Sequence, residues 1–288
     1  MKRRFLLLSA SLLWIVPTAF AQGLPPLGPP QAPAAAAPAS LSVEAINNDL
    51  KTARAANQEK RYADAEALML KDTAAKPGLP VLWIELGQAQ LGLKKWNEAE
   101  TSFKAAMGST IASAPNKASG GGFYANDGKG THSGVTISDT DDPSKQKRSP
   151  EIDGLIQSSL GEIYIHTNRV PEAEAAFDRA VAADPAKAGL YLGNETIFFL
   201  QVGNAAAQVA AANKAIAVDP TRAALYFFKG QGLAAQSTID PKTQKLVMPA
   251  GCAEALQKYL SMEPAGQYAP DAKGMLAAAG IAVKAGKK

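Results

Sequence analysis

Residues 157–185 read QSSLGEIYIHTNRVPEAEAAFDRAVAADP, and this stretch predicts a pair of helices. Gly161 lies in its first apolar segment, and Ala173 lies in its second. Small residues at these two places let antiparallel helices approach closely, while Phe177 fills the gap towards the next pair. Pro185 stops the second helix, because proline lacks the amide hydrogen that continues a helix. The stretch therefore predicts one helix–turn–helix unit.

A second copy of the pattern covers residues 82–107, LWIELGQAQLGLKKWNEAETSFKAAM. Its Gly87 and Ala99 repeat the spacing of Gly161 and Ala173, and Phe103 follows at the place of Phe177. Both copies resemble the tetratricopeptide repeat (TPR), a helix–turn–helix unit of about 34 residues. The resemblance implies an all-α fold, a solenoid of stacked hairpins, and a role as a protein–protein scaffold.

Three weaker copies complete an array of about five hairpins, and they end at Pro77, Pro220 and Pro264. The first helix of the array is expected from about 43 to 57. The fourth copy carries one residue more than the standard length, so its frame is open by one residue. A helix within 268–283 is expected to cap the array, because the last hairpin of a solenoid otherwise exposes its apolar face.

Two insertions interrupt the expected TPR domain, residues 42–284. The longer, about 108–149, is rich in Gly, Ser, Thr and Asp. We expect it to be flexible, because it has too few apolar side chains to build a core. Whether it instead covers the binding face stays open. The shorter, about 236–250, is expected to form a β-hairpin that turns at Asp240-Pro241.

The N-terminus is predicted to be a targeting segment. Residues 1–21, MKRRFLLLSASLLWIVPTAFA, combine a basic start, an apolar run and small residues at Ala19 and Ala21. This is the pattern of a bacterial secretory signal peptide cleaved after Ala21, by the general or the twin-arginine route. The run is shorter than the about 20 residues that span a bilayer, so we expect no stable membrane insertion after cleavage. Residues 22–41 are expected to form an extended Pro/Ala-rich linker, and the protein is expected to be periplasmic or secreted.

The charge balance argues against a nucleic-acid partner. The formal net charge of +4 comes from 30 Lys and Arg against 26 Asp and Glu. Lys2, Arg3 and Arg4 lie in the predicted signal peptide, so the remaining chain has a formal charge of +1. No stripe of basic residues is left to neutralise phosphates.

No residue pattern indicates catalysis. His132 and His166 are the only histidines, and neither has ligands at the spacing of a metal site. Cys252 is the only cysteine, and we interpret it as a small buried residue. We therefore expect no cofactor, no metal ion, no catalytic residue and no enzymatic activity.

The resemblance places partner binding on a concave face, at the second, fifth, ninth and twelfth positions of each first helix. We count from Pro80, Gly154, Ala188 and Ala223. Lys and Asn, which clamp a peptide carboxylate in some TPR domains, are absent from these positions. A mixed apolar and amide face suits an extended peptide or an amphipathic helix. Equally, several apolar members could pack against the insertion or the linker. The candidates are Val81, Ile84, Gln88, Leu91, Leu155, Ser158, Glu162, Ile165, Thr196, Phe227 and Gln231.

Two functional hypotheses follow from the sequence. The first is an extracytoplasmic scaffold that binds a protein or peptide partner, within an envelope or secretion assembly. The alternative is a carbohydrate- or peptidoglycan-binding accessory factor that stacks sugars on exposed aromatic side chains. Its candidates are Trp83, Trp96, Phe123 and Tyr124.

The repeat pattern also makes a prediction about packing. Gly161 is expected to touch the second helix of its hairpin near Ala173 and Ala180. Leucine at position 161 would overpack this contact. Alanine is expected to be nearly neutral there, because many repeats accept alanine at the eighth position.

Overall fold

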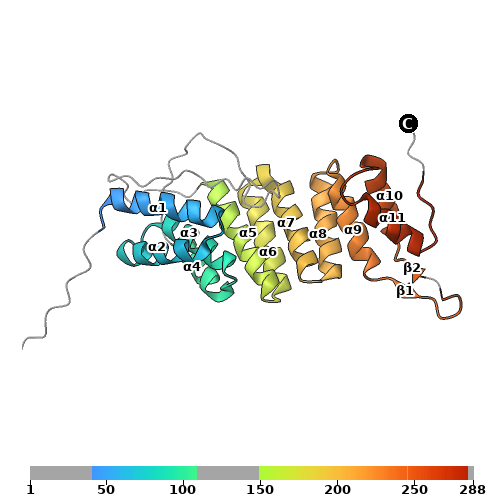
Figure 1. Ribbon diagram of the computed structural model, residues 1–288, viewed down its shortest axis with the longest axis horizontal. Coiled ribbons are helices and arrows are strands. Elements are labelled where there is room, and N and C mark those ends of the chain that lie inside the picture. Colours follow the sequence, from blue (N-terminus) through green and yellow to red (C-terminus); the bar gives the residue numbers. More distant parts are fainter. Residues whose placement is uncertain (1–40, 109–148, 245, 285–288) are drawn as a thin grey trace, which may run out of the picture. The chain divides into compact units, whose positions relative to one another are not determined.

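The structure is a computed structural model that describes residues 41–108, 149–244 and 246–284. The predicted signal peptide, residues 22–40 of the predicted linker and residues 109–148 of the longer insertion lie outside the described residues. In the described part, helices follow one another as antiparallel pairs in chain order (Figure 1). The predicted all-α array of five hairpins with a final helix is confirmed.

The first helix of each hairpin is called helix A below, and the second is called helix B. The A helices are α1 (Val43–Gln58), α3 (Pro80–Gly92), α5 (Pro150–His166), α7 (Ala188–Gln201) and α9 (Ala223–Ala234). The B helices are α2 (Tyr62–Ala75), α4 (Trp96–Gly108), α6 (Val170–Ala183), α8 (Ala205–Val218) and α10 (Cys252–Met262). The capping helix is α11 (Ala269–Ala278).

Helix B ends at the same point relative to proline in four hairpins. Pro77, Pro185, Pro220 and Pro264 each lie two residues after the last helical residue. The residue between is extended, as at Asp184 with φ −131° and ψ 79°. Proline imposes this geometry, because its ring excludes the helical conformation of the residue before it. The sequence signal for helix ends is therefore confirmed.

The turn from helix A to helix B is the same in the first four hairpins. Its middle residue has a positive φ, at Lys60, Lys94, Asn168 and Gly203. The next amide reaches back to the last turn of helix A, as when Arg169 N–H donates to Tyr164 O at 2.7 Å. This left-handed ending saturates carbonyls that a helix end leaves free, and it sets the short connection that keeps the two helices antiparallel.

Two of these turns are also tied to the preceding hairpin. Lys95, at the start of one B helix, contacts Glu66 of the previous B helix at 2.6 Å. Arg169 makes the equivalent contact with Glu100, and the shorter of its two nitrogen–oxygen distances is 2.5 Å. Exposed ion pairs contribute at most about 1 kcal/mol each. Their repetition indicates that neighbouring hairpins stack in one register.

Close approach of the two helices depends on glycine. A Cβ atom placed on Gly161 would lie 2.5 Å from the Phe177 ring, and one on Gly87 would lie 2.9 Å from Phe103. The predicted contact with the second helix is thus present, and the nearest atoms to Gly161 belong to Phe177, which lies between Ala173 and Ala180 on α6. The expectation that Gly161→Ala is neutral must be corrected, because even a methyl group displaces Phe177.

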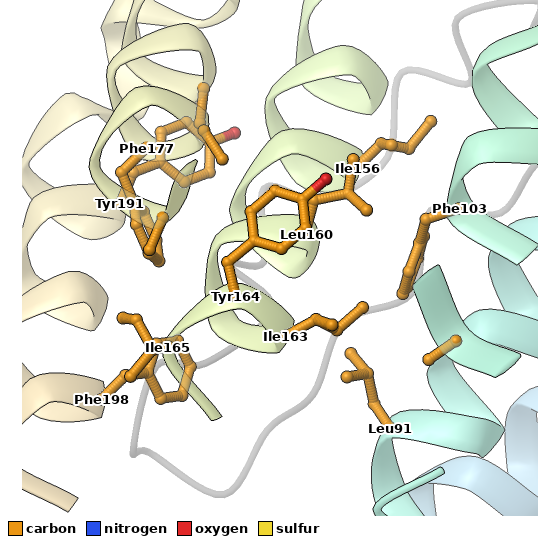
Figure 2. Close-up of a cluster of buried hydrophobic side chains, with 14 of the residues drawn as sticks. Leu91, Phe103, Ile156, Leu160, Ile163, Tyr164, Ile165, Phe177, Tyr191 and Phe198 are labelled. Atoms are coloured by element: carbon orange, nitrogen blue, oxygen red, sulfur yellow. The ribbon is translucent and has the colours of Figure 1, made fainter. Parts of the chain in front are cut away.

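The largest core cluster surrounds α5. Leu91 and Phe103, from α3 and α4, lie on one side of this helix, and Phe177 and Phe198 lie on the other (Figure 2). Ile163 points towards Leu91 (Figure 2). The helix is therefore buried along most of its length, and only the stripe between these two sides is left for other contacts.

The capping helix is held by an aromatic cluster. The rings of Phe227 in α9 and Tyr268, just before α11, stack with centroids 4.4 Å apart and 5° between their planes. The Tyr268 amide donates to the Tyr259 hydroxyl at 2.9 Å. Aromatic pairs add about 0.5–1.5 kcal/mol beyond their area burial. The cluster anchors α11 to the last hairpin.

The shorter insertion forms the predicted β-hairpin between α9 and α10. Strands β1 (Thr238–Ile239) and β2 (Leu246–Val247) are antiparallel, with Thr238 opposite Val247. The Asp240 carboxylate accepts hydrogen bonds from the amides of Lys242 and Thr243, which shapes the turn. Cys252 follows the hairpin and is fully buried, so its interpretation as a small buried residue is confirmed.

Candidate functional site

The repeat frame is defined by the residues that face each other within a hairpin. Gly161 faces Phe177 and Gly87 faces Phe103 at the same spacing along the chain, and these are the eighth and twenty-fourth positions. In the fourth hairpin the same spacing separates Thr196 from Ala212, and both are buried. The turn residue Gly203 also follows Thr196 by the seven residues that separate Asn168 from Gly161.

The position of this turn decides the frame that the sequence left open. Thr196 takes the eighth position and not the ninth, and its hydroxyl donates to Leu192 O at 2.9 Å. The ninth and twelfth positions of α7 are then Ile197 and Leu200. We call the surface formed by the second, fifth, ninth and twelfth positions of the A helices the A-face. A helix turns about 100° per residue, so these positions form one stripe.

Most of the predicted partner-binding residues are buried. Thr196 is 0% exposed, Phe227 is 2% exposed and Glu162 is 9% exposed. Ile84, Gln88, Leu91 and Ile165 are buried as well. The partly exposed candidates are Val81, Leu155, Ser158 and Gln231. Partner binding by the candidates stays a prediction, and the partly exposed ones are the members that a partner can reach first.

The ninth positions form a ladder between neighbouring A helices. Arg54 of α1 donates from Nε to Glu85 Oε1 of α3 at 2.7 Å. Gln88 of α3 donates from Nε2 to Ser159 Oγ of α5 at 3.4 Å. In both rungs the acceptor occupies the sixth position of the next A helix. The ladder fixes the offset between A helices and explains why Gln88 is buried.

Glu162 holds the ninth position of α5, where the next rung would start. Its Oε2 atom is buried and has no hydrogen-bond partner among the described residues. Burial raises the pKa of its carboxyl to about 8, because the charged form loses its hydration. A buried polar atom without a partner costs about 1–3 kcal/mol. Glu162 therefore places on the A-face a buried carboxyl oxygen whose hydrogen-bonding capacity is unused.

The end of the A-face towards α11 is partly closed. Phe227, at the fifth position of α9, is covered by the stacked Tyr268 ring. Gln231, at the ninth position, keeps a buried Oε1 atom that has no partner in the described part of the chain. The ninth positions of α5 and α9 thus each carry a buried oxygen that has no hydrogen-bond partner among the described residues.

In two hairpins the glycine at the eighth position faces the aromatic ring at the twenty-fourth position, and the described helices follow one another in pairs. These two observations decide the fold. The chain folds, in its described part, as a TPR-like solenoid of helical hairpins. No protein-family model matches it, and no curated protein matches it.

Several solved structures are similar to this chain. YrrB, described as a TPR protein with an unusual peptide-binding site, has a TM-score of 0.47 and 13% identity, covering 81% of this chain and 100% of that one. MamA also has a TM-score of 0.47 and 13% identity, covering 85% of this chain and all of that one. The C-terminal part of a TPR protein from Cytophaga hutchinsonii has a TM-score of 0.32 and 13% identity, with coverages of 77% and 83%.

The aromatic candidates for sugar stacking are engaged within the TPR array. The Trp83 indole donates from Nε1 to Pro77 O at 2.8 Å. Trp96 stacks on His166, with centroids 4.3 Å apart and 10° between the planes. Burial, and secondarily the charge of Lys94, lowers the pKa of His166. The other two candidates, Phe123 and Tyr124, lie outside the described residues.

No helix in the described ranges is long and apolar enough to cross a bilayer. Within the same ranges, His, Cys, Asp and Glu side chains form no group of three or more that could hold a metal ion.

Sequence reasoning placed Glu162 on the A-face but did not find its burial or its missing partner. It also missed the ladder. A signal was available, because Arg54 and Glu85 are 31 residues apart, three fewer than one repeat. Pairs of polar residues at this spacing can be searched for in any TPR sequence.

Proposed function

We propose that this TPR solenoid is an extracytoplasmic scaffold that binds a protein or peptide partner along its A-face, within an envelope or secretion assembly. The observation that carries the proposal is the pair of buried oxygens on the ninth positions, Glu162 Oε2 and Gln231 Oε1, which lack partners in the described residues. A bound peptide offers backbone and side-chain donors to such atoms. The hydrogen bonds so formed remove the free-energy penalty of a buried acceptor without a partner.

The partly exposed members of the A-face suit an elongated partner. They combine apolar groups with one hydroxyl and one amide group over α3, α5, α7 and α9. Extended peptides and amphipathic helices bind such surfaces with apolar anchors and a few hydrogen bonds. The residues that a partner would meet first are Val81, Leu155, Ser158, Ile197, Leu200 and Gln231.

A charged substitution on the A-face tests where the partner binds. Ser158→Arg places a long cation on the partly exposed face of α5 and is expected to remove a partner that the wild type captures from an envelope fraction. Ala175→Arg is the matched control, because Ala175 is exposed on helix B. Quantitative mass spectrometry of the captured proteins measures the effect. Equal capture by both variants would place the partner elsewhere on the protein.

The location is proposed from residues 1–21, whose basic start, apolar run and Ala19 and Ala21 match a secretory signal peptide. We expect the exported protein to begin at Gln22. Mass spectrometry of the intact protein from the periplasm or the medium measures this terminus. Recovery of chains that retain Met1 in a membrane fraction would contradict cleavage.

A further inference from the structure

Glu162 and Glu85 are two buried acids on A helices, and they differ in their ion-pair partners. Glu85 is as deeply buried as Glu162 and receives the Arg54 guanidinium at 2.7 Å. Glu162 receives no cation from the described residues, and its Oε2 atom accepts no hydrogen bond from them. The array therefore contains one buried acid that is paired with a cation, on α3, and one that is not, on α5.

The direction of the Glu162 side chain follows from its neighbours. Gly161 faces Phe177 of α6. Ile163 lies in the core and points towards Leu91 of α3 (Figure 2). Residues 161 and 163 leave the helix on nearly opposite sides, because each residue advances the helix by more than a quarter of a turn, so residue 162 points between these two contacts. Glu162 thus shares its stripe with the partly exposed Ser158 and is aimed at the A-face.

We propose that Glu162 receives a Lys or Arg side chain of the bound peptide, in the way that Glu85 receives Arg54 within the fold. This inference rests on the proposed function and adds the chemistry of the partner. A buried carboxylate is strongly favoured only when it is paired and hydrogen-bonded. A guanidinium or ammonium group supplies both the charge and the donors, whereas a neutral peptide group supplies no charge.

The proposal predicts a single cationic anchor with apolar residues beside it. Leu155 lies on the same stripe of α5 as Glu162, is partly exposed and presents an aliphatic group. Ile197, at the ninth position of the next A helix, continues the apolar surface. A peptide that carries one Lys or Arg between apolar residues therefore matches this part of the A-face.

The test uses a library of random peptides selected against the full-length protein. Peptides selected by the wild type are expected to share a Lys or Arg at one position, and those selected by Glu162→Gln are expected to lack it. Glu172→Gln, an exposed acid on α6, controls for the change in net charge. The best peptide is then compared with a version in which norleucine replaces its Lys, or its Arg.

Calorimetric titration of the two peptides against the wild type and Glu162→Gln gives a double-mutant cycle. Loss of the cation is expected to weaken binding to the wild type by roughly tenfold to a hundredfold, the range for a hydrogen-bonded charge pair. The same change is expected to alter binding to Glu162→Gln by less than about twofold.

An equal loss in the wild type and in Glu162→Gln would overturn the inference, because the cation would then bind elsewhere. If Ser158→Arg abolished binding of the same peptide in that case, the A-face would still be the binding surface, but without a cation at Glu162. If no peptide were selected by the wild type, both the function and the inference would fall.

Discussion

Gly161→Leu is expected to destabilise the protein by about 3 kcal/mol or more, the upper range for overpacking a close contact. The reason is geometric, because the first added carbon already lies 2.5 Å from the buried Phe177 ring. Three further carbons have no space between α5 and α6. Urea unfolding followed by circular dichroism measures the effect.

Gly161→Ala separates steric crowding from helix propensity. Crowding costs about 1–3 kcal/mol, and alanine returns up to about 1 kcal/mol as a better helix former, so a net loss of about 1 kcal/mol is expected. Gly274→Ala is the matched control, since Gly274 lies within α11 and a Cβ there meets no atom within 4 Å. The control should gain stability. A Gly161→Leu variant as stable as the wild type would show that the repeat frame is wrong.

The protein is expected to lose stability as the pH rises from 5 to 9. Burial is the main cause that raises the pKa of three carboxyl groups. The pKa is about 8 at Glu162, about 7 at Glu195 and about 6 at Asp72. Between the ordinary pKa near 4.5 and these values, the unfolded chain releases protons that the folded chain keeps. Stability therefore falls with increasing pH across this window.

The largest share of this pH dependence is assigned to Glu162. The pKa of this carboxyl rises from the ordinary 4.5 to about 8, and one pKa unit corresponds to about 1.4 kcal/mol, so Glu162 is expected to account for on the order of 5 kcal/mol. Glu162→Gln should match the wild type at pH 5 and exceed its stability at pH 9. Glu172→Gln, exposed on α6, should keep the wild-type slope. Unfolding free energies that do not change with pH would show that the carboxyl is hydrated.

The hairpins could be predicted because each repeat signal acts locally. Pro185 ends its helix whatever residues lie nearby. Glycine, as at Gly161, leaves room where an aromatic ring lies against the helix backbone. The fourth frame could not be decided, because Thr196 and Ala212 exchange the usual small and large residues between the two helices. Only the packed structure shows which pair belongs together.

The candidate site was predicted less completely, because burial on the A-face depends on other repeats. Phe227 is covered by Tyr268, which follows the end of the next helix, and Gln88 is covered where it reaches Ser159. Helix periodicity assigns a residue to a stripe of its own helix. It carries no information on how deeply the neighbouring hairpins enclose that stripe.

The joint between the second and third hairpins has a consequence for the evolution of the chain. Helix α4 packs against α5, and the Gln88–Ser159 and Glu100–Arg169 contacts cross from one hairpin to the other. Packing, and not the length of the connection, therefore aligns them. Doubling a connection costs only about 0.6 kcal/mol in loop closure. The connection between Gly108 and Ser149 is thus a site that tolerates insertions and deletions during evolution. Even a foreign domain can be inserted there without changing the packing of the helices.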